Sequence, residues 1–260
     1  MVRGLERFRR QFAGRSSGFV LIGGAACHEW FALQALSFRA TKDLDLVIVV
    51  EALDEASIET FRRFIDEGGY QTRERFDGTP ELYRFSAPTQ PAFPFMLELF
   101  SRKPEGLDLR IGQAVVPVDA GNAAKSLSAI LLDDDYYRLL QDHALMLDGL
   151  PVATVSALVP LKARAWLDLT ERRARGEQVD QRDIDKHRND VFRLAAIISG
   201  GPALLPPRVR ADLQRFLDAF PDDHACWPAI FAALRATFGR QLFRATDLRG
   251  AIADHFALQA

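Results

Sequence analysis

Two acidic residues, Asp43 and Asp45, precede an apolar run at 46–49 (Leu-Val-Ile-Val). In a β-strand, residues i and i+2 project to the same face, so both carboxylates are expected on one face of a strand. Their like charges repel unless a cation lies between them, and hard divalent cations take oxygen ligands. The pair therefore predicts a metal site, with Mg²⁺ as the ion.

A third acidic residue, Glu98, stands in the middle of the apolar segment 95–100. A carboxylate buried without a partner destabilises a fold, so Glu98 needs a partner. One account is an ion pair with one of the nearby arginines. The other account is that Glu98 is a third metal ligand, on a strand beside the one that bears Asp43 and Asp45.

An apolar strand at 19–22 ends in a glycine pair, Gly23 and Gly24, and passes directly into a helical segment. This order leaves free backbone N–H groups at the positive end of the helix dipole, where phosphate binds. A glycine pair can equally make a tight turn and nothing more. In the following loop, Arg39 and Thr41 could hold the helix and the acidic strand in register, or reach a substrate phosphate. A phosphate site beside a metal site indicates nucleotide chemistry.

The order of a glycine turn, one helix and an acidic pair on the next strand resembles the nucleotidyltransferase core of the DNA polymerase beta superfamily. The superfamily pattern also has an isolated acid on a later strand, which Glu98 matches. The resemblance implies that Asp43, Asp45 and Glu98 hold Mg²⁺ and that a nucleoside triphosphate (NTP) binds at Gly23 and Gly24.

Two charged residues of the second half of the chain stand among apolar ones. Lys162 follows Leu161 on a helical segment, where it either extends to the helix rim or points at a triphosphate. Asp190 lies where the polar first part of another helical segment meets an apolar run. Lysine in a Leu-x-x-Leu-Lys-Ala context, followed by a second lysine and then an aspartate before a hydrophobic residue, resembles the C-terminal half of AbiEii/AbiGii-type nucleotidyltransferase toxins. The resemblance spans residues 18–198.

This second resemblance implies that Lys162 and Asp190 complete the nucleotide site. Asp190 is expected to orient Lys162 or to accept a hydrogen bond from the base or ribose. Accordingly, we expect Asp190→Ala to lose activity with little loss of stability. The chain departs from the family at Ala25 and Ala26, because Ser or Thr often follows the family's glycines. Backbone amides alone are therefore expected to bind the phosphate, or the activity is altered.

Hydrophobic periodicity predicts an α+β fold in which a mixed sheet with helices precedes a helical bundle. We expect a nucleotidyltransferase core at 1–120 and a helical C-terminal domain at 121–260. The strands are expected at 19–22, 43–49, 70–76, 81–86, 95–100 and 114–118, with a hairpin turn at 77–80. Helices are expected at 3–14, 25–36, 52–67, 123–132, 135–147, 155–175, 183–198, 208–220, 227–238 and 247–256.

Composition places the chain among ordinary globular proteins, with 260 residues of which 48% are hydrophobic. Its 33 basic and 35 acidic residues argue against a non-specific nucleic-acid coat. The basic segments at 172–175 and 182–188 are interpreted as solvated helix faces, with local nucleic-acid contact as the alternative. Cys27 and Cys226 show no metal-ligand spacing. No apolar run approaches the ~20 residues that cross a membrane, and no signal peptide is evident, so a cytoplasmic location is expected.

These observations together predict a Mg²⁺-dependent nucleotidyltransferase that moves a nucleoside monophosphate from an NTP to an acceptor hydroxyl and releases pyrophosphate. The toxin resemblance implies tRNA or protein as the acceptor and a cognate antitoxin as a partner. Two alternatives stay open. The fold could serve as a non-catalytic nucleotide-sensing or protein-interaction module, or as a small-molecule nucleotidyltransferase.

Overall fold

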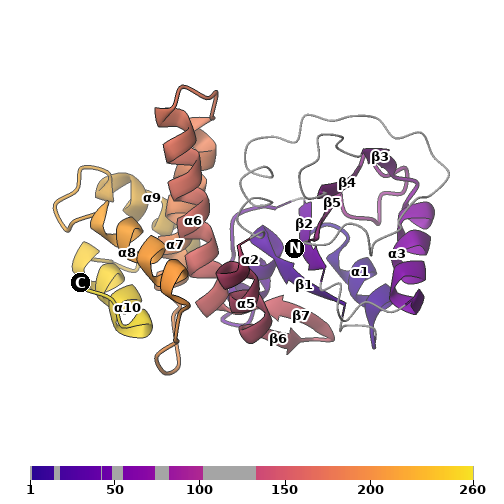
Figure 1. Ribbon diagram of the computed structural model, residues 1–260, viewed down its shortest axis with the longest axis horizontal. Helices are drawn as coiled ribbons and strands as arrows, with labels where there is room; N and C mark the ends of the chain where they lie inside the picture. The colour runs from indigo at the N-terminus through magenta and orange to yellow at the C-terminus, as the bar shows by residue number, and fades with distance from the viewer. Residues whose placement is uncertain are drawn as a thin grey trace.

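A computed structural model describes residues 2–14, 18–41, 43–48, 55–73, 82–101 and 133–259. A mixed sheet with covering helices forms one half of the molecule, and helices α6 to α10 form the other (Figure 1). This arrangement confirms the α+β fold class. Helices α6 and α7 lie between the sheet and the outer helices (Figure 1).

The described strands form one seven-stranded sheet in the order β3-β4-β5-β2-β1-β7-β6. Strands β2 and β5 pair in parallel, as do β1 and β7, and the other neighbours are antiparallel. The acidic strand β2 therefore lies inside the sheet, between β1 and β5. The strands are β1 (Phe19–Ile22), β2 (Asp43–Ile48), β3 (Gln71–Arg73), β4 (Leu82–Ser86), β5 (Met96–Ser101), β6 (Ala144–Leu147) and β7 (Leu150–Ala153).

The helices of the first half follow from their apolar spacing. Leu5, Phe8 and Phe12 recur at helical intervals, and all three are buried where α1 packs on α3. Phe8 and Phe12 stack on each other at 4.2 Å between ring centroids and also contact Phe19 and Phe61. The described helices before residue 102 are α1 (Leu5–Phe12), α2 (Gly23–Ala32) and α3 (Glu55–Gly68).

Helix α5 (Asp134–Asp142) is followed by five further helices, of which α6 is the longest. The remaining bounds are α6 (Val155–Ala174), α7 (Gln181–Ala195), α8 (Pro207–Asp218), α9 (Trp227–Phe238) and α10 (Ala245–Phe256). Each agrees closely with a helix expected from the periodicity. Among the helices of the described ranges, none is long and apolar enough to cross a membrane.

The helix predicted at 135–147 is wrong in its second half. Helix α5 ends at Asp142, and the chain then forms a hairpin of β6 and β7. The two turn residues, Asp148 and Gly149, have φ of 46° and 81°, the left-handed conformation that tight hairpin turns require. Strand β6 pairs with β7, which is fully buried beside β1, so pairing within the sheet outweighs the helical spacing of a short apolar run.

Several expectations lie outside the described residues. They are the hairpin turn at 77–80, the strand at 114–118 and the helix at 123–132. The predicted domain boundary at residue 120 also lies outside the described residues. Strands β6 and β7 follow that boundary in the sequence and belong to the sheet.

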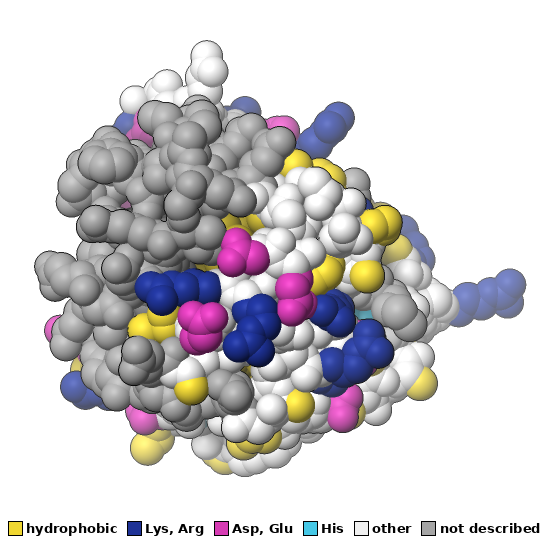
Figure 2. All heavy atoms as spheres, turned by 90° about the vertical axis from the view of Figure 1, so that its right-hand side faces the viewer, with side chains coloured by type: hydrophobic (Ala, Val, Ile, Leu, Met, Phe, Trp, Pro, Cys, Tyr) yellow, Lys and Arg dark blue, Asp and Glu magenta, His cyan; other side chains and the backbone are white. Residues whose placement is uncertain are grey.

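The face that carries α1 and α3 has basic and acidic side chains close together (Figure 2). The ion pair between Arg7 of α1 and Glu67 of α3 is one example. In the described part of this face the charges alternate and do not form a stripe of one sign, which is typical of a solvated surface.

Candidate functional site

The acidic residues of β2 and β5 lie on one face of the sheet. Asp45 is the Cα partner of Glu98 in the parallel pairing, and Asp43 lies two residues earlier on β2. Side chains of directly paired residues project to the same face, so all three carboxylates share it. Glu98 is 6% exposed. Asp43 and Asp45 are half-buried.

As the side chains lie, no three His, Cys, Asp or Glu residues in the described ranges converge closely enough to hold a metal ion. Metal ligation by Asp43, Asp45 and Glu98 therefore stays a prediction. The ion-pair account of Glu98 also stays open, because its Cα partner on β4 is Arg84.

The glycine pair forms the first turn of α2 and lies against the acidic strand. Gly23 has φ of 67°, and a Cβ atom there would collide with Asp45 Oδ2. Helix α2 begins at Gly23, two residues earlier than the sequence predicts, and no side chain in the described ranges caps its first amides. The N-terminal N–H groups of α2 and the Asp45 carboxyl group therefore lie side by side.

Thr41 supplies a hydroxyl at this turn. Its Oγ1 lies 2.8 Å from the place that a Cβ atom on Gly24 would occupy, and Arg39 Nη2 lies 3.6 Å from the same place. The absence of Ser or Thr after the glycines therefore does not leave the turn without a hydroxyl. The sequence contained Thr41, but its distance of seventeen positions from Gly24 concealed the contact.

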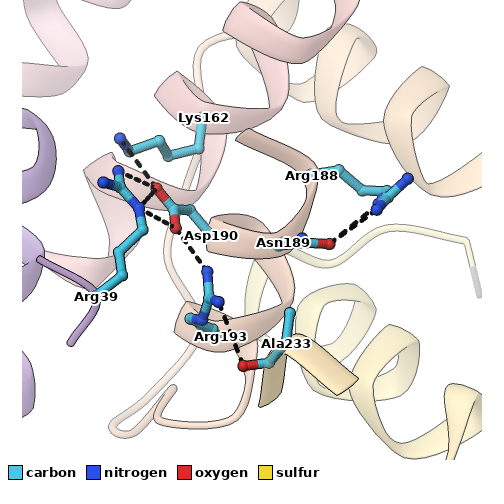
Figure 3. Close-up of polar contacts among 7 residues, drawn as sticks. All are labelled: Arg39, Lys162, Arg188, Asn189, Asp190, Arg193 and Ala233. Carbon is cyan, nitrogen blue, oxygen red and sulfur yellow. Dashed lines mark hydrogen bonds and ion pairs between the residues drawn. The ribbon is translucent and has the colours of Figure 1, made fainter. Parts of the chain in front are cut away.

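Asp190 on α7 is the centre of a buried ion cluster (Figure 3). Arg39 Nε donates to Oδ1 at 3.0 Å and to Oδ2 at 3.2 Å, and Arg39 Nη2 donates to Oδ2 at 2.7 Å. Arg193 Nη1 donates to Oδ1 at 3.0 Å, and Lys162 Nζ lies 3.4 Å from Oδ2. One carboxylate is thus shared by three cations, from the α2–β2 loop, α6 and α7.

Burial and charge act in opposite directions on this cluster. Burial by itself raises the pKa of Asp190, but Lys162, Arg39 and Arg193 overcome it and hold that pKa well below its usual range. Burial lowers the pKa of Arg39, and the Asp190 carboxylate reverses this to a net rise. Asp190 is therefore a carboxylate at neutral pH, and it holds Arg39 and Lys162 in fixed positions.

The expectation that Asp190→Ala costs little stability is incompatible with this geometry. The side chain of Asp190 is fully buried, and its removal leaves three cations without their shared partner. Removing one partner of a buried ion pair destabilises a protein by about 3–5 kcal/mol. The carboxylate is structural whatever else it does.

A continuous set of contacts joins the glycine turn to the helical half. Asp45 lies against Gly23, and Arg39 lies beside Gly24 and binds Asp190, which also contacts Lys162. The structure therefore brings the expected residues of both halves to the N-terminal end of α2. Beneath them lies Cys27, whose complete burial raises the pKa of its thiol to about 12.

Three further residues of α7 belong to this region and were not predicted as site residues. Arg193 lies three positions after Asp190 and Lys186 four positions before it, so both share its face of the helix. His187 is 8% exposed, and neither ring nitrogen has a hydrogen-bond partner among the described residues. The i+3 and i+4 spacing around Asp190 was a signal that could have identified the two cations.

A cavity lies elsewhere, at the C-terminal end of α2. It has a volume of about 460 Å³ and is lined in part by Trp30, Leu33, His143 and Ser156. Ser156 Oγ lies 2.9 Å from His255 Nε2. This cavity shares no lining residue with the acidic strand or the ion cluster.

No protein-family model matches the chain, and no curated protein sequence is significantly similar to it. Among solved structures, the chain is similar to an antigenic nucleotidyltransferase-like protein from Paracoccidioides brasiliensis. The two are 15% identical with a TM-score of 0.40, over 84% of each chain. A likeness at this level assigns neither activity nor ligand to this chain.

Proposed function

We propose that the chain is a divalent-metal-dependent nucleotidyltransferase that transfers a nucleoside monophosphate from an NTP to a hydroxyl group. The observation that carries the proposal is the meeting of three features at one end of α2. They are an acidic strand face, uncapped helix amides and a cation held by a buried carboxylate. These are the groups that a metal-bound polyphosphate requires.

The donor chemistry of the acidic face fits Mg²⁺, because all its candidate ligands are carboxylate oxygens. Asp43, Asp45 and Glu98 would hold the ion, after rotation of side chains that do not converge as they lie. A bound ion would supply charge neutralisation of the triphosphate and a lowered pKa for the attacking hydroxyl.

The protein's own groups bind and orient the triphosphate. The first amides of α2, at Gly23 and Gly24, donate to phosphate oxygens, and the Thr41 hydroxyl adds a donor beside Gly24. Lys162 provides a point charge, and Asp190 keeps its ammonium at a fixed place. Positioning of this kind supplies most of the catalysis in phosphoryl-group chemistry.

The acceptor and the biological role extend this proposal. A tRNA or protein hydroxyl as acceptor, and a toxin role with an antitoxin partner, are supported only by the motif resemblance at Lys162 and Asp190. The alternating charges on the α1 and α3 face give no support to a large RNA footprint there.

The test is transfer of label from each of the four NTPs, with Mg²⁺, to total RNA or protein. Asp43→Ala and Asp45→Ala should abolish labelling, and Lys162→Ala should reduce it about 100-fold or more, as loss of a preorganised charge does. The matched control is Asp223→Ala, which removes an exposed carboxylate from the α8–α9 loop. Absence of labelling in the folded wild-type protein contradicts the proposal. Full activity in Lys162→Ala would remove the helical half from the chemistry and leave only the core as the transferase.

A second candidate function is nucleotide binding without turnover. The observation that favours it is that the described acidic side chains do not form a metal-holding group as they lie. NTP-dependent stabilisation against heat, without pyrophosphate release at any Mg²⁺ concentration, would select this candidate over the transferase.

A further inference from the structure

Lys186 of α7 is a half-buried cation for which the described chain provides no ion pair or hydrogen bond. It lies one helical turn before Asp190, at the i, i+4 spacing that places two side chains on one helix face. Asp183, one turn further towards the start of α7, makes no ion pair with Lys186 in the described chain, although the charges of Asp183 and Asp190 both raise the pKa of Lys186. Lys186 therefore carries a positive charge towards the ion cluster and has no acidic partner there.

Asp190 cannot serve as that partner. A carboxylate offers two oxygens with about four acceptor positions. Arg39 makes three contacts with these oxygens, and Arg193 and Lys162 make one each. The acceptor positions are already taken, so Lys186 adds a fourth cation to a cluster with one carboxylate.

The surroundings of Lys186 oppose its own charge. Burial lowers the pKa of Lys186, and the nearby cations Lys162 and Arg39 lower it further. The adjacent His187 is kept neutral by the same causes, since burial first and then Lys162 and Lys186 hold its pKa well below the ordinary value. A half-buried cation without an ion pair, next to a buried imidazole without a hydrogen-bond partner in the described chain, marks a place where a ligand completes the polar contacts.

We propose that Lys186 binds the β- and γ-phosphates of the NTP beside Lys162, and so distinguishes triphosphates from monophosphates. This inference rests on the proposed function and assigns a residue to the leaving group. A triphosphate fits because it gathers about four negative charges into one compact group, whereas a nucleic-acid strand carries one charge per phosphate along its backbone. Four cations around one carboxylate match the compact anion.

The experiment measures binding of inorganic tripolyphosphate and of AMP to the full chain by calorimetry, in EDTA so that only protein groups act. Lys186→Met should lower tripolyphosphate affinity about 10-fold or more, the scale of a charge-assisted hydrogen bond. AMP affinity should change less than about 2-fold, because that ligand lacks the two outer phosphates. Lys186→Arg should restore most of the tripolyphosphate affinity, and Arg10→Met, an exposed control on α1, should leave it unchanged.

Thermal unfolding without ligand separates binding from a structural role. Lys186→Met should melt at the same or a higher temperature, because it removes a repelling charge from the cluster. A lower melting temperature would assign Lys186 to the fold and overturn the inference. So would unchanged tripolyphosphate affinity, or equal losses for both ligands. With single-stranded RNA titrated as a third ligand, a loss of affinity confined to the RNA would assign Lys186 to the acceptor and overturn the inference too.

The outcome also separates this inference from the proposed function. Lys186-dependent binding of tripolyphosphate by a protein that transfers no nucleotide supports the phosphate contact and contradicts the transferase. Transfer activity in the wild type, together with the same polyphosphate affinity in wild type and Lys186→Met, supports the transferase and contradicts the phosphate contact.

Discussion

Asp190 shows how one residue links the two halves of the molecule. The sequence placed it correctly at the meeting of a polar and an apolar helix face, and Lys162 in an apolar setting. Lys162 Nζ lies 3.4 Å from Asp190 Oδ2, and the role of this contact at a nucleotide stays a prediction. No pattern in the sequence indicates that Arg39, which is 151 positions away, binds the same carboxylate. Pairing over that distance depends on the tertiary fold, and local spacing does not encode it.

Replacement of Asp190 by Asn should destabilise the protein by about 3–5 kcal/mol, because three cations lose their shared charge partner. The free energy of unfolding from urea titration at pH 7 measures this loss. Asp223→Asn, at an exposed position, should change it by less than about 0.5 kcal/mol. A free energy of unfolding for Asp190→Asn equal to that of the wild type would show that the charge of Asp190 contributes nothing to stability.

The same variant has a defined pH dependence. The pKa of Asp190 in the folded protein lies below its unfolded value of about 3.9, so its contribution is fully present above that value. The contribution is lost as the pH falls through the unfolded pKa towards the folded one. The unfolding free energies of wild type and Asp190→Asn should therefore differ by a constant amount above about pH 5 and converge as the pH falls below about 4. A difference in unfolding free energy that stays constant below about pH 4 would show that the loss of stability does not come from the Asp190 charge.

At the scale of elements, the periodicity predicted the helices well and failed at the β6–β7 hairpin. Residues 144–153 contain too few positions to separate a period of 3.6 from a period of 2. The turn signal was present as Asp148-Gly149, a pair that favours hairpins. The parallel pairing of β7 with β1 decides the structure, and a sequence read in order does not show which distant strand is the neighbour.

The first turn of α2 gives a matched pair of variants. Gly23→Ala should destabilise the protein by about 1–3 kcal/mol, because φ of 67° is strained for alanine and its Cβ collides with Asp45. Gly24→Ala should cost less, since its Cβ meets the Thr41 hydroxyl at 2.8 Å and that side chain can rotate. Thermal unfolding of both variants shows which of them loses more stability. Equal losses would show that the backbone at Gly23 is not constrained as described.

At the scale of the whole molecule, one hydrophobic core runs through both halves, from Val2 to Phe256. Trp30 of α2 donates from Nε1 to the carbonyl of Ala153 in β7 at 2.7 Å, so it reports on the sheet half. Trp166 and Trp227 lie in the helical half, among phenylalanines of α7 and α8. The two halves share buried contacts and should therefore unfold together.

Tryptophan variants test this cooperativity. Trp166→Phe with Trp227→Phe leaves Trp30 as the reporter, and Trp30→Phe leaves the other two. Within each variant, fluorescence and far-UV circular dichroism should give the same urea midpoint. A separate fluorescence transition in either variant would show that the halves unfold independently.

The long separation between Arg39 and Asp190 also bears on how the chain is made. Synthesis runs at about 5–20 residues per second, so roughly 8 to 30 s pass between the two residues during translation. Throughout that interval the guanidinium group of Arg39 lacks the Asp190 carboxylate as a partner. It can therefore be buried as an ion pair only after α7 has been synthesised. The N-terminal end of α2 therefore acquires its final charge arrangement late in biosynthesis, and a nascent chain shorter than 190 residues lacks it.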